Sequence, residues 1–288
     1  GDYKDYTLLY IPYCTGDVHW GDATVEYAND LVIHHRGYQN TKAALEYLYA
    51  RVFSPREIFV TGCSAGAYGS VLNSVHIAEQ YPDSRMAVLA DSGSGIITDT
   101  FLIDSFPGWN ALSHLPETLT RLQAPLETLT IKDVYQSITE SYPQHRYAQY
   151  STEFDNSQTF FFEAMGGVYT EWSGRQRDIL TSLDADLDNF RVYLAPGPLH
   201  CLGAYPYFAE REVNNVRFAD WQRQFIEGDT MPDSVYCEGL NCFDDDFCVQ
   251  CEANDGGPGC NFCSQWPERY AERRAEEEAS AQSGNGTD

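Results

Sequence analysis

The order of apolar and polar positions predicts alternating strands and helices in the first third of the chain. Apolar runs at 7–11, 57–61 and 86–90 are long enough for buried strands and too short for buried helices. Apolar residues at helical spacing predict a helix over 41–53, and the composition of 67–79 is that of another. Parallel strands need crossover connections, which these helices supply. The pattern therefore predicts an α/β fold with a mostly parallel sheet and helices on both faces.

The remaining chain predicts an insertion, one more strand and a distinct C-terminal region. Residues 99–150 are helix-like but interrupted by prolines, which is typical of a helical insertion over one end of a sheet. A strand is predicted at 190–195 and a final helix at 216–227. After Gly228 the composition shifts to Cys, Asp and Gly. We expect three parts: an α/β domain at 1–232, a Cys-rich appendage at 233–265 and an acidic, disordered tail at 266–288.

The charge balance argues against nucleic acid and anionic membranes as partners. The sequence has 18 Lys and Arg against 43 Asp and Glu, a formal net charge of −25. Such a charge repels phosphate backbones and acidic lipids. No apolar run approaches the roughly 20 residues that cross a bilayer. Hydrophobic residues make up 43% of the chain, enough to bury a core, so we expect a globular protein with no nucleic-acid partner and no membrane span.

A predicted strand–turn–helix element carries the sequence Gly62-Cys63-Ser64-Ala65-Gly66. This is the GxSxG pattern of a nucleophile elbow, in which a sharp turn exposes the serine. Small residues on either side are expected because the turn is tight and its backbone strained. The following helix begins at the turn, so the Ala65 N–H can stabilise the oxyanion of a tetrahedral intermediate. A glycine-rich turn that only packs closely is the alternative, so the assignment needs a base.

His200 is the candidate base and two aspartates are candidate acids. Of seven histidines, only His200 lies in a loop after a convincing last strand, where the order Ser, acid, His of α/β-hydrolases places the base. A structural histidine is the alternative. Asp155 follows a β-prone stretch between Ser64 and His200, whereas Asp91 ends the strand after the elbow helix. Spacing alone does not choose between the two acids.

With these residues and several further segments, the sequence resembles the pectin acetylesterase/Notum family of α/β-hydrolase serine carboxylesterases. The resemblance extends from about residue 6 to 227, and its most specific part is the string YCTGDVHWG. It rests on these segments: 11–21, Gly37-Tyr38-Gln39-Asn40, 62–70, Phe154-Asp155-Asn156-Ser157-Gln158, and Pro196-Gly197 leading to His200.

The resemblance implies a role for each matching residue. Ser64 would be the nucleophile, His200 the base and Asp155, rather than Asp91, the acid. Further residues would belong to the pocket or the oxyanion hole: Ala65, Gly16, Asp17 and His19. For Asp17, a turn residue that caps local amides is the alternative. The family pattern also has an earlier strand and a glycine-rich loop that completes the oxyanion hole. This sequence holds neither, so we expect a fragment of a longer protein or a chain that has lost this part.

The cysteines predict disulfides more than a metal site. Six of nine cysteines lie between residues 237 and 263, among them two CxxC pairs. Four thiolates at this spacing could bind zinc, but oxidising compartments favour disulfides. We favour disulfides, no metal, and a secreted protein. Three other cysteines are expected to be buried packing residues: Cys14, Cys63 and Cys201.

We therefore predict a serine carboxylesterase that works through an acyl-enzyme with no metal or organic cofactor. The resemblance implies an acetyl ester on a polysaccharide such as pectin as the substrate, with a fatty-acyl ester, as in a lipoprotein, as the second choice. Lipases and serine peptidases share the motif on the same fold. From another class, the alternative is a non-catalytic relative that binds a glycan or a protein partner, which the missing glycine-rich loop supports.

Overall fold

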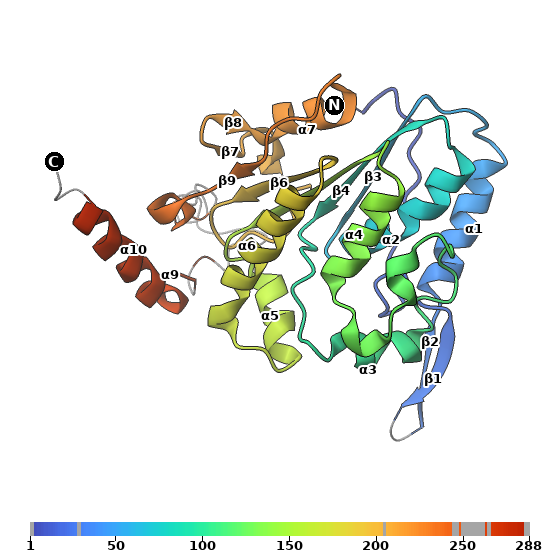
Figure 1. Cartoon of the computed structure of the whole chain (residues 1–288), viewed down its shortest axis with the longest axis horizontal. Coiled ribbons are helices and arrows are strands. Elements are labelled where there is room, and N and C mark those ends of the chain that lie inside the picture. Colours follow the sequence, from blue (N-terminus) through green and yellow to red (C-terminus); the bar gives the residue numbers. More distant parts are fainter. Residues whose placement is uncertain are drawn as a thin grey trace.

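A computed structural model describes residues 3–27, 30–203, 206–243, 248, 263 and 266–284. Within them, the centre is a five-stranded parallel sheet in the order β3-β4-β5-β6-β9 (Figure 1). This confirms the predicted α/β class with a mostly parallel sheet. The strands are β3 (Glu57–Cys63), β4 (Arg85–Asp91), β5 (Arg146–Thr152), β6 (Phe190–Ala195) and β9 (Val235–Tyr236).

The register brings the carboxyl ends of the strands to one edge of the sheet. Cys63 pairs with Asp91, Asp91 with Tyr150, and Thr152 with Ala195. Ligands and reactions on open parallel sheets lie at this edge. The loops that follow the strands therefore bring together residues that are far apart in sequence.

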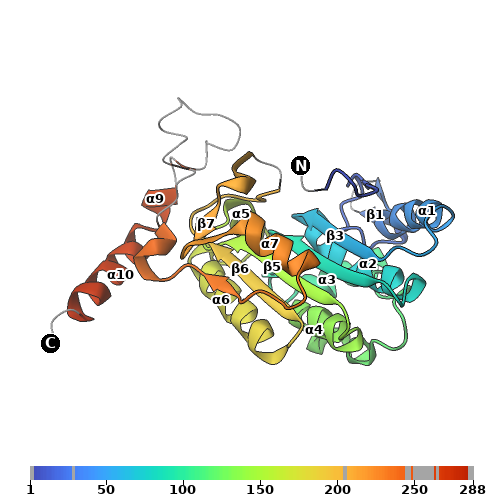
Figure 2. The ribbon, with the colours of Figure 1, turned by 90° about the horizontal axis from the view of Figure 1, so that it is seen from above.

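Helices cover both faces of the sheet, as predicted. Helices α2 (Ala65–Gln80), α4 (Ile131–Ser141) and α6 (Tyr169–Asp186) share one hydrophobic cluster with strand residues such as Val88. Helix α7 (Phe218–Glu227) packs on the other face, where Leu89 lies (Figure 2). Residues 86–90 of β4 are buried on both faces of the sheet, which explains why they form a continuous apolar run.

Smaller elements surround this core. Helix α1 (Gly37–Tyr49) packs against α2, and the antiparallel strands β1 (Ala23–Tyr27) and β2 (Leu31–His35) form a hairpin. The other elements are α3 (Phe101–Trp109), η1 (Thr120–Gln123), η2 (Leu126–Thr128), α5 (Asn156–Ala164), η3 (Pro206–Ala209), β7 (Glu212–Val213), β8 (Val216–Arg217), η4 (Gly239–Phe243), α9 (Trp266–Arg269) and α10 (Ala271–Gly284). No helix in the described part of the chain is apolar enough over a sufficient length to cross a bilayer.

Two sequence expectations about the body of the fold were wrong. Residues 7–11 are not a strand: Leu8 is 87% exposed and Tyr10 79%, and a strand needs a neighbour to accept and donate its hydrogen bonds. The predicted insertion at 99–150 includes α4, a crossover helix that packs on α2, and the start of β5. Only α3, η1 and η2 remain as an insertion between core elements.

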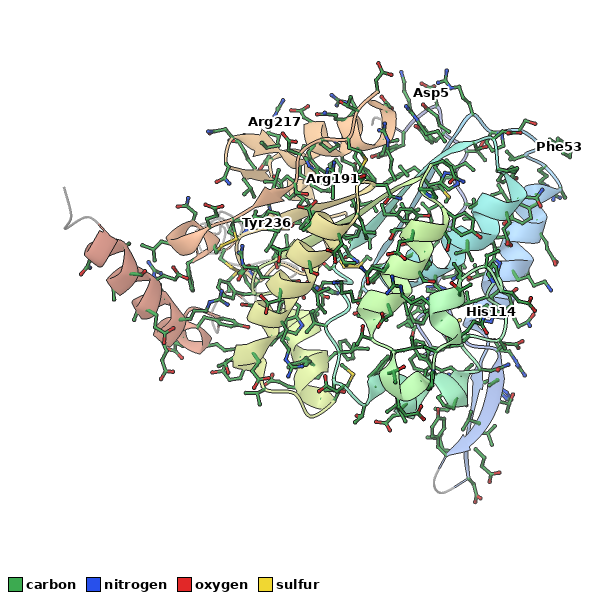
Figure 3. The ribbon with its side chains drawn as sticks, viewed as in Figure 1. Asp5, Phe53, His114, Arg191, Arg217 and Tyr236 are labelled. Carbon is green, nitrogen blue, oxygen red and sulfur yellow. A yellow bond between two sulfur atoms is a disulfide. The ribbon has the colours of Figure 1, made fainter. Side chains whose placement is uncertain are left out.

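The C-terminal division also differs from the expectation. Residues 266–284 form α9 and α10 instead of a disordered tail, and the Tyr270 ring packs 4.4 Å from that of Phe154. Strand β9, within the predicted appendage, belongs to the main sheet. Arg191 of β6 and Tyr236 of β9, both labelled in Figure 3, converge on Asp184 of α6. Residues 285–288 lie outside the described residues.

Candidate active site

The strand–turn–helix element at Ser64 has the geometry of a nucleophile elbow. Ser64 has φ 58° and ψ −119°, a strained conformation for a residue with a side chain. Its amide donates to the carbonyl of Asp91 at 2.8 Å, and its own carbonyl accepts from Ala67 at 2.9 Å. Ala65 is the first residue of α2, so its N–H has no acceptor within the helix. The turn thus presents a hydroxyl beside an amide available for an oxyanion.

The two glycines of the elbow have different roles. A Cβ on Gly62 would lie 2.2 Å from the carbonyl oxygen of Gly66, so the turn cannot close with a larger residue there. A Cβ on Gly66 would meet no atom within 4 Å. Small size is therefore required at Gly62, but not at Gly66 as the sequence argument supposed.

Asp155 and His200, 45 residues apart in sequence, lie in direct contact. The Nδ1 atom of His200 is 2.9 Å from both carboxylate oxygens of Asp155, which is fully buried. Asp155 also caps α5, accepting from the Gln158 amide at 2.9 Å, and its Oδ2 accepts from Gln158 Nε2 at 2.9 Å. Since an ionised carboxylate only accepts, Nδ1 is the donor and Nε2 keeps its lone pair. This is the tautomer that a general base needs.

The charge environment favours protonation of His200. Burial lowers the pKa of the imidazole, but the charge of Asp155, its hydrogen bond to Nδ1 and the charge of Asp91 together outweigh burial. The pKa of His200 therefore lies above its ordinary value of 6.5. The raised pKa means that these neighbouring groups stabilise the imidazolium, which is the form of His200 produced when a serine gives it a proton.

A disulfide joins the Ser64 turn to the His200 loop. Cys63 and Cys201 are bonded, with their Cα atoms 5.6 Å apart. Cys201 is buried as expected, but Cys63 is exposed, and the expectation that the two are packing residues without a bond was wrong. Cys14, the third of that group, is exposed and free among the described residues.

The signal for the bridge was present in the sequence, because one cysteine precedes Ser64 and the other follows His200. The fold that brings the Ser64 turn and the His200 loop to one sheet edge also brings these neighbouring cysteines together. Within the described residues the disulfide links the two loops, and no hydrogen bond joins Ser64 Oγ to the imidazole.

Asp91, the other candidate acid, contacts the His200 loop instead of Nδ1. It is 7% exposed, and its carboxylate accepts from the backbone amides of Leu202 and Gly203 at 3.1 and 2.9 Å. Burial raises the pKa of Asp91 to about 6, although both amides and the charge of His200 lower it. The geometry therefore separates the two candidates, since only Asp155 bonds to the imidazole ring.

The carboxylate of Asp17 accepts hydrogen bonds from several neighbouring residues. Asp17 is fully buried and accepts from Thr15 Oγ1 at 2.5 Å, the Gly37 amide at 2.8 Å and the His19 amide at 3.2 Å. These are the bonds of a turn residue that caps amides. The His19 ring lies 4.9 Å from that of Tyr13, and burial lowers the pKa of His19 more than the charge of Asp17 raises it.

Gly16, next to Asp17, has φ 63°, in the left-handed region that glycine adopts without strain. Among the described residues, no hydrogen bond connects Gly16, Asp17 or His19 to Ser64 or His200. Their assignment to the substrate pocket stays a prediction.

The described C-terminal cysteines form disulfides. Cys237 is bonded to Cys242 and Cys248 to Cys263. The second bridge uses one cysteine from each CxxC pair, so the alternative site of four zinc-bound thiolates cannot form. The other two cysteines of these pairs, Cys251 and Cys260, lie outside the described residues.

A cavity of about 310 Å³ lies at the far end of α5 from Asp155. Its walls come from the 98–100 loop, the end of α5 and the start of α6, including Phe162, Val168 and Arg175. Ser64, Asp155 and His200 are not among the residues that line it.

Comparisons with known proteins identify the family and the fold of this chain. The family whose profile matches is described as Pectinacetylesterase, and the match covers residues 2–165. Two solved structures of the Wnt deacylase Notum from Drosophila share the fold at 15% identity. One has a TM-score of 0.53 over 78% of this chain and 70% of that chain. The other, a second crystal form, has a TM-score of 0.55 over 81% and 72%. No curated protein sequence matches the chain.

Proposed function

The chain belongs to the pectinacetylesterase family, and from this premise we propose that it is a serine carboxylesterase. The observation that carries the proposal is the contact of His200 with buried Asp155, in a loop that a disulfide ties to the strained Ser64 turn. A binding module has no need for a strained serine, a buried acid and a histidine at one sheet edge. The alternative of a non-catalytic relative is therefore the weaker one.

The proposed reaction runs through an acyl-enzyme. Ser64 Oγ attacks the ester carbonyl while Nε2 of His200 takes the hydroxyl proton. Asp155 holds Nδ1 and stabilises the imidazolium, and the Ala65 N–H donates to the oxyanion. As the tetrahedral intermediate collapses, the imidazolium gives its proton to the leaving alcohol. Water then attacks the acyl-enzyme by the same route and releases the carboxylic acid.

An acetyl ester on a polysaccharide such as pectin is the proposed substrate, because the matched family is named for it. A fatty-acyl ester is the second candidate, because the structurally similar Notum is a Wnt deacylase. The net charge of −25 disfavours a polyanionic glycan in bulk. The three disulfides in the described part of the chain support secretion, where oxidising conditions preserve them.

The test compares the wild type with Ser64→Ala, with the exposed Ser113→Ala as the matched control. Each is incubated with a fluorophosphonate probe and weighed intact by mass spectrometry, and its hydrolysis of p-nitrophenyl acetate and octanoate is followed. We expect one label on the wild type and on Ser113→Ala, and none on Ser64→Ala. The ratio of acetate to octanoate rates then chooses between acetyl and fatty-acyl substrates. A wild type with neither label nor turnover would refute the esterase.

A further inference from the structure

Asp91 is bonded to both sides of the candidate active site. At the carboxyl end of β4, its carbonyl oxygen accepts from the Ser64 amide at 2.8 Å. Its side chain, 7% exposed, reaches the opposite loop and accepts from Leu202 and Gly203. One residue thus holds the backbone of the nucleophile and the chain that follows the base.

The loop after His200 is held at each of its next three amides. The Cys201 amide donates to Ser92 Oγ at 2.9 Å, the Leu202 amide to Asp91 Oδ1 at 3.1 Å, and the Gly203 amide to Asp91 Oδ2 at 2.9 Å. Cys201 and Ser92 both have positive φ, at 60° and 59°. Residues outside the favoured backbone regions persist only where the surroundings fix them. Here the surroundings are the end of β4 and the bridge from Cys63.

A carboxylate at position 91 can accept hydrogen bonds from both amides of the loop. Each of its two oxygens accepts one amide, so an asparagine in its place would turn an N–H₂ group toward one of the two donors. The titratable group that acts on it is His200, whose charge favours the ionised form of Asp91. His200 Nδ1 lies 2.9 Å from the Asp155 carboxylate, and the negative charges of both Asp155 and Asp91 act on the imidazole.

We propose that Asp91 is a positioning residue for His200. It anchors the 201–203 loop so that the imidazole stays aligned between Asp155 and Ser64, and its charge adds to that of Asp155 in stabilising the imidazolium. This role rests on the proposed esterase function. It differs from the role of triad acid for which Asp91 was first considered.

The test uses Asp91→Asn and Asp91→Glu, with the exposed Asp188→Asn as control. For each we would measure kcat and KM for p-nitrophenyl acetate across pH, the midpoint of thermal unfolding, and the titration of the His200 ring by NMR. We expect kcat of Asp91→Asn to fall roughly 10- to 100-fold at an almost constant KM, as a small misplacement of a catalytic group does. The pKa of His200 should fall in the same variant. Asp91→Glu keeps the charge and should lie between wild type and Asn in kcat, and Asp188→Asn should match the wild type.

The NMR titration separates this inference from the proposed function. If the wild type neither labels nor turns over, the esterase is refuted, but the pKa of His200 in Asp91→Asn still tests the anchoring. If Asp91→Asn does not fold, the Glu variant supplies both readouts. A fall in thermal midpoint alone, with kcat and the His200 titration unchanged, would show that Asp91 is only structural and would overturn the proposal.

Discussion

Removal of the Cys63–Cys201 disulfide is expected to lower both stability and turnover. The bridge joins residues 138 positions apart. By the chain-entropy relation for a closed loop, a bridge of this span restricts the unfolded chain by about 5 kcal/mol at 25 °C. At about 2–4 °C per kcal/mol for a domain of this size, the double variant Cys63→Ala/Cys201→Ala should melt roughly 10–20 °C lower. Because the bridge also ties the Ser64 turn to the His200 loop, turnover should fall about 10-fold or more.

The Cys237–Cys242 bridge is the matched control. It spans only 5 residues, for which the same relation gives about 2 kcal/mol. We would measure urea unfolding, thermal unfolding and p-nitrophenyl acetate hydrolysis for both double alanine variants. The loss of stability should be about 3 kcal/mol larger for the active-site bridge, and only that variant should lose most of its turnover. Equal losses of stability in the two variants, or full turnover without the Cys63–Cys201 bridge, would refute the reasoning.

Three further predictions follow from the site. Asp155→Asn should lower kcat about 10⁴-fold. The base must be neutral, so activity rises with pH through the His200 pKa, and without the Asp155 charge this acidic limb should move to lower pH. Gly62→Ala should abolish activity or folding because its Cβ would meet a carbonyl at 2.2 Å, whereas Gly66→Ala should retain activity and gain up to about 1 kcal/mol from helix propensity, measured by unfolding. Gln158→Met removes the Gln158 Nε2 donor from the buried Asp155 carboxylate and leaves His200 Nδ1 as its side-chain donor, and we expect a loss of about 1–3 kcal/mol of stability together with lower kcat.

The parts of the site that could be predicted were those that depend on local chain geometry. Ser64 was identifiable because a GxSxG turn between a strand and a helix has one conformation, and that conformation is present. The choice of Asp155 over Asp91 needed the family resemblance, because Asp91 ends β4 and Asp155 follows the end of β5 at the same sheet edge. Only the folded positions show that one reaches Nδ1 while the other reaches the backbone at 202–203.

The errors have a common physical cause in long-range contacts. Residues 7–11 have strand composition, but a strand forms only where a neighbour is present to pair with it. The acidic stretch at 266–284 has the composition of a disordered tail, yet Arg273 of α10 donates to buried Glu153 at 2.9 Å and Tyr270 packs on Phe154. Composition reports what a segment prefers alone, and these partners lie more than 100 residues away.

The sequence by itself determined the class of fold, the elbow and the candidate base, because hydrophobic period and turn chemistry act over a few residues. The tertiary structure alone showed the contact between Asp155 and His200, the bond between Cys63 and Cys201, and the hydrogen bonds from the loop after His200 to Asp91. Each of these is a contact between strand ends that the parallel sheet aligns at one edge. The separation of two residues in sequence does not predict this alignment, because the strand ends come together only when the sheet has formed.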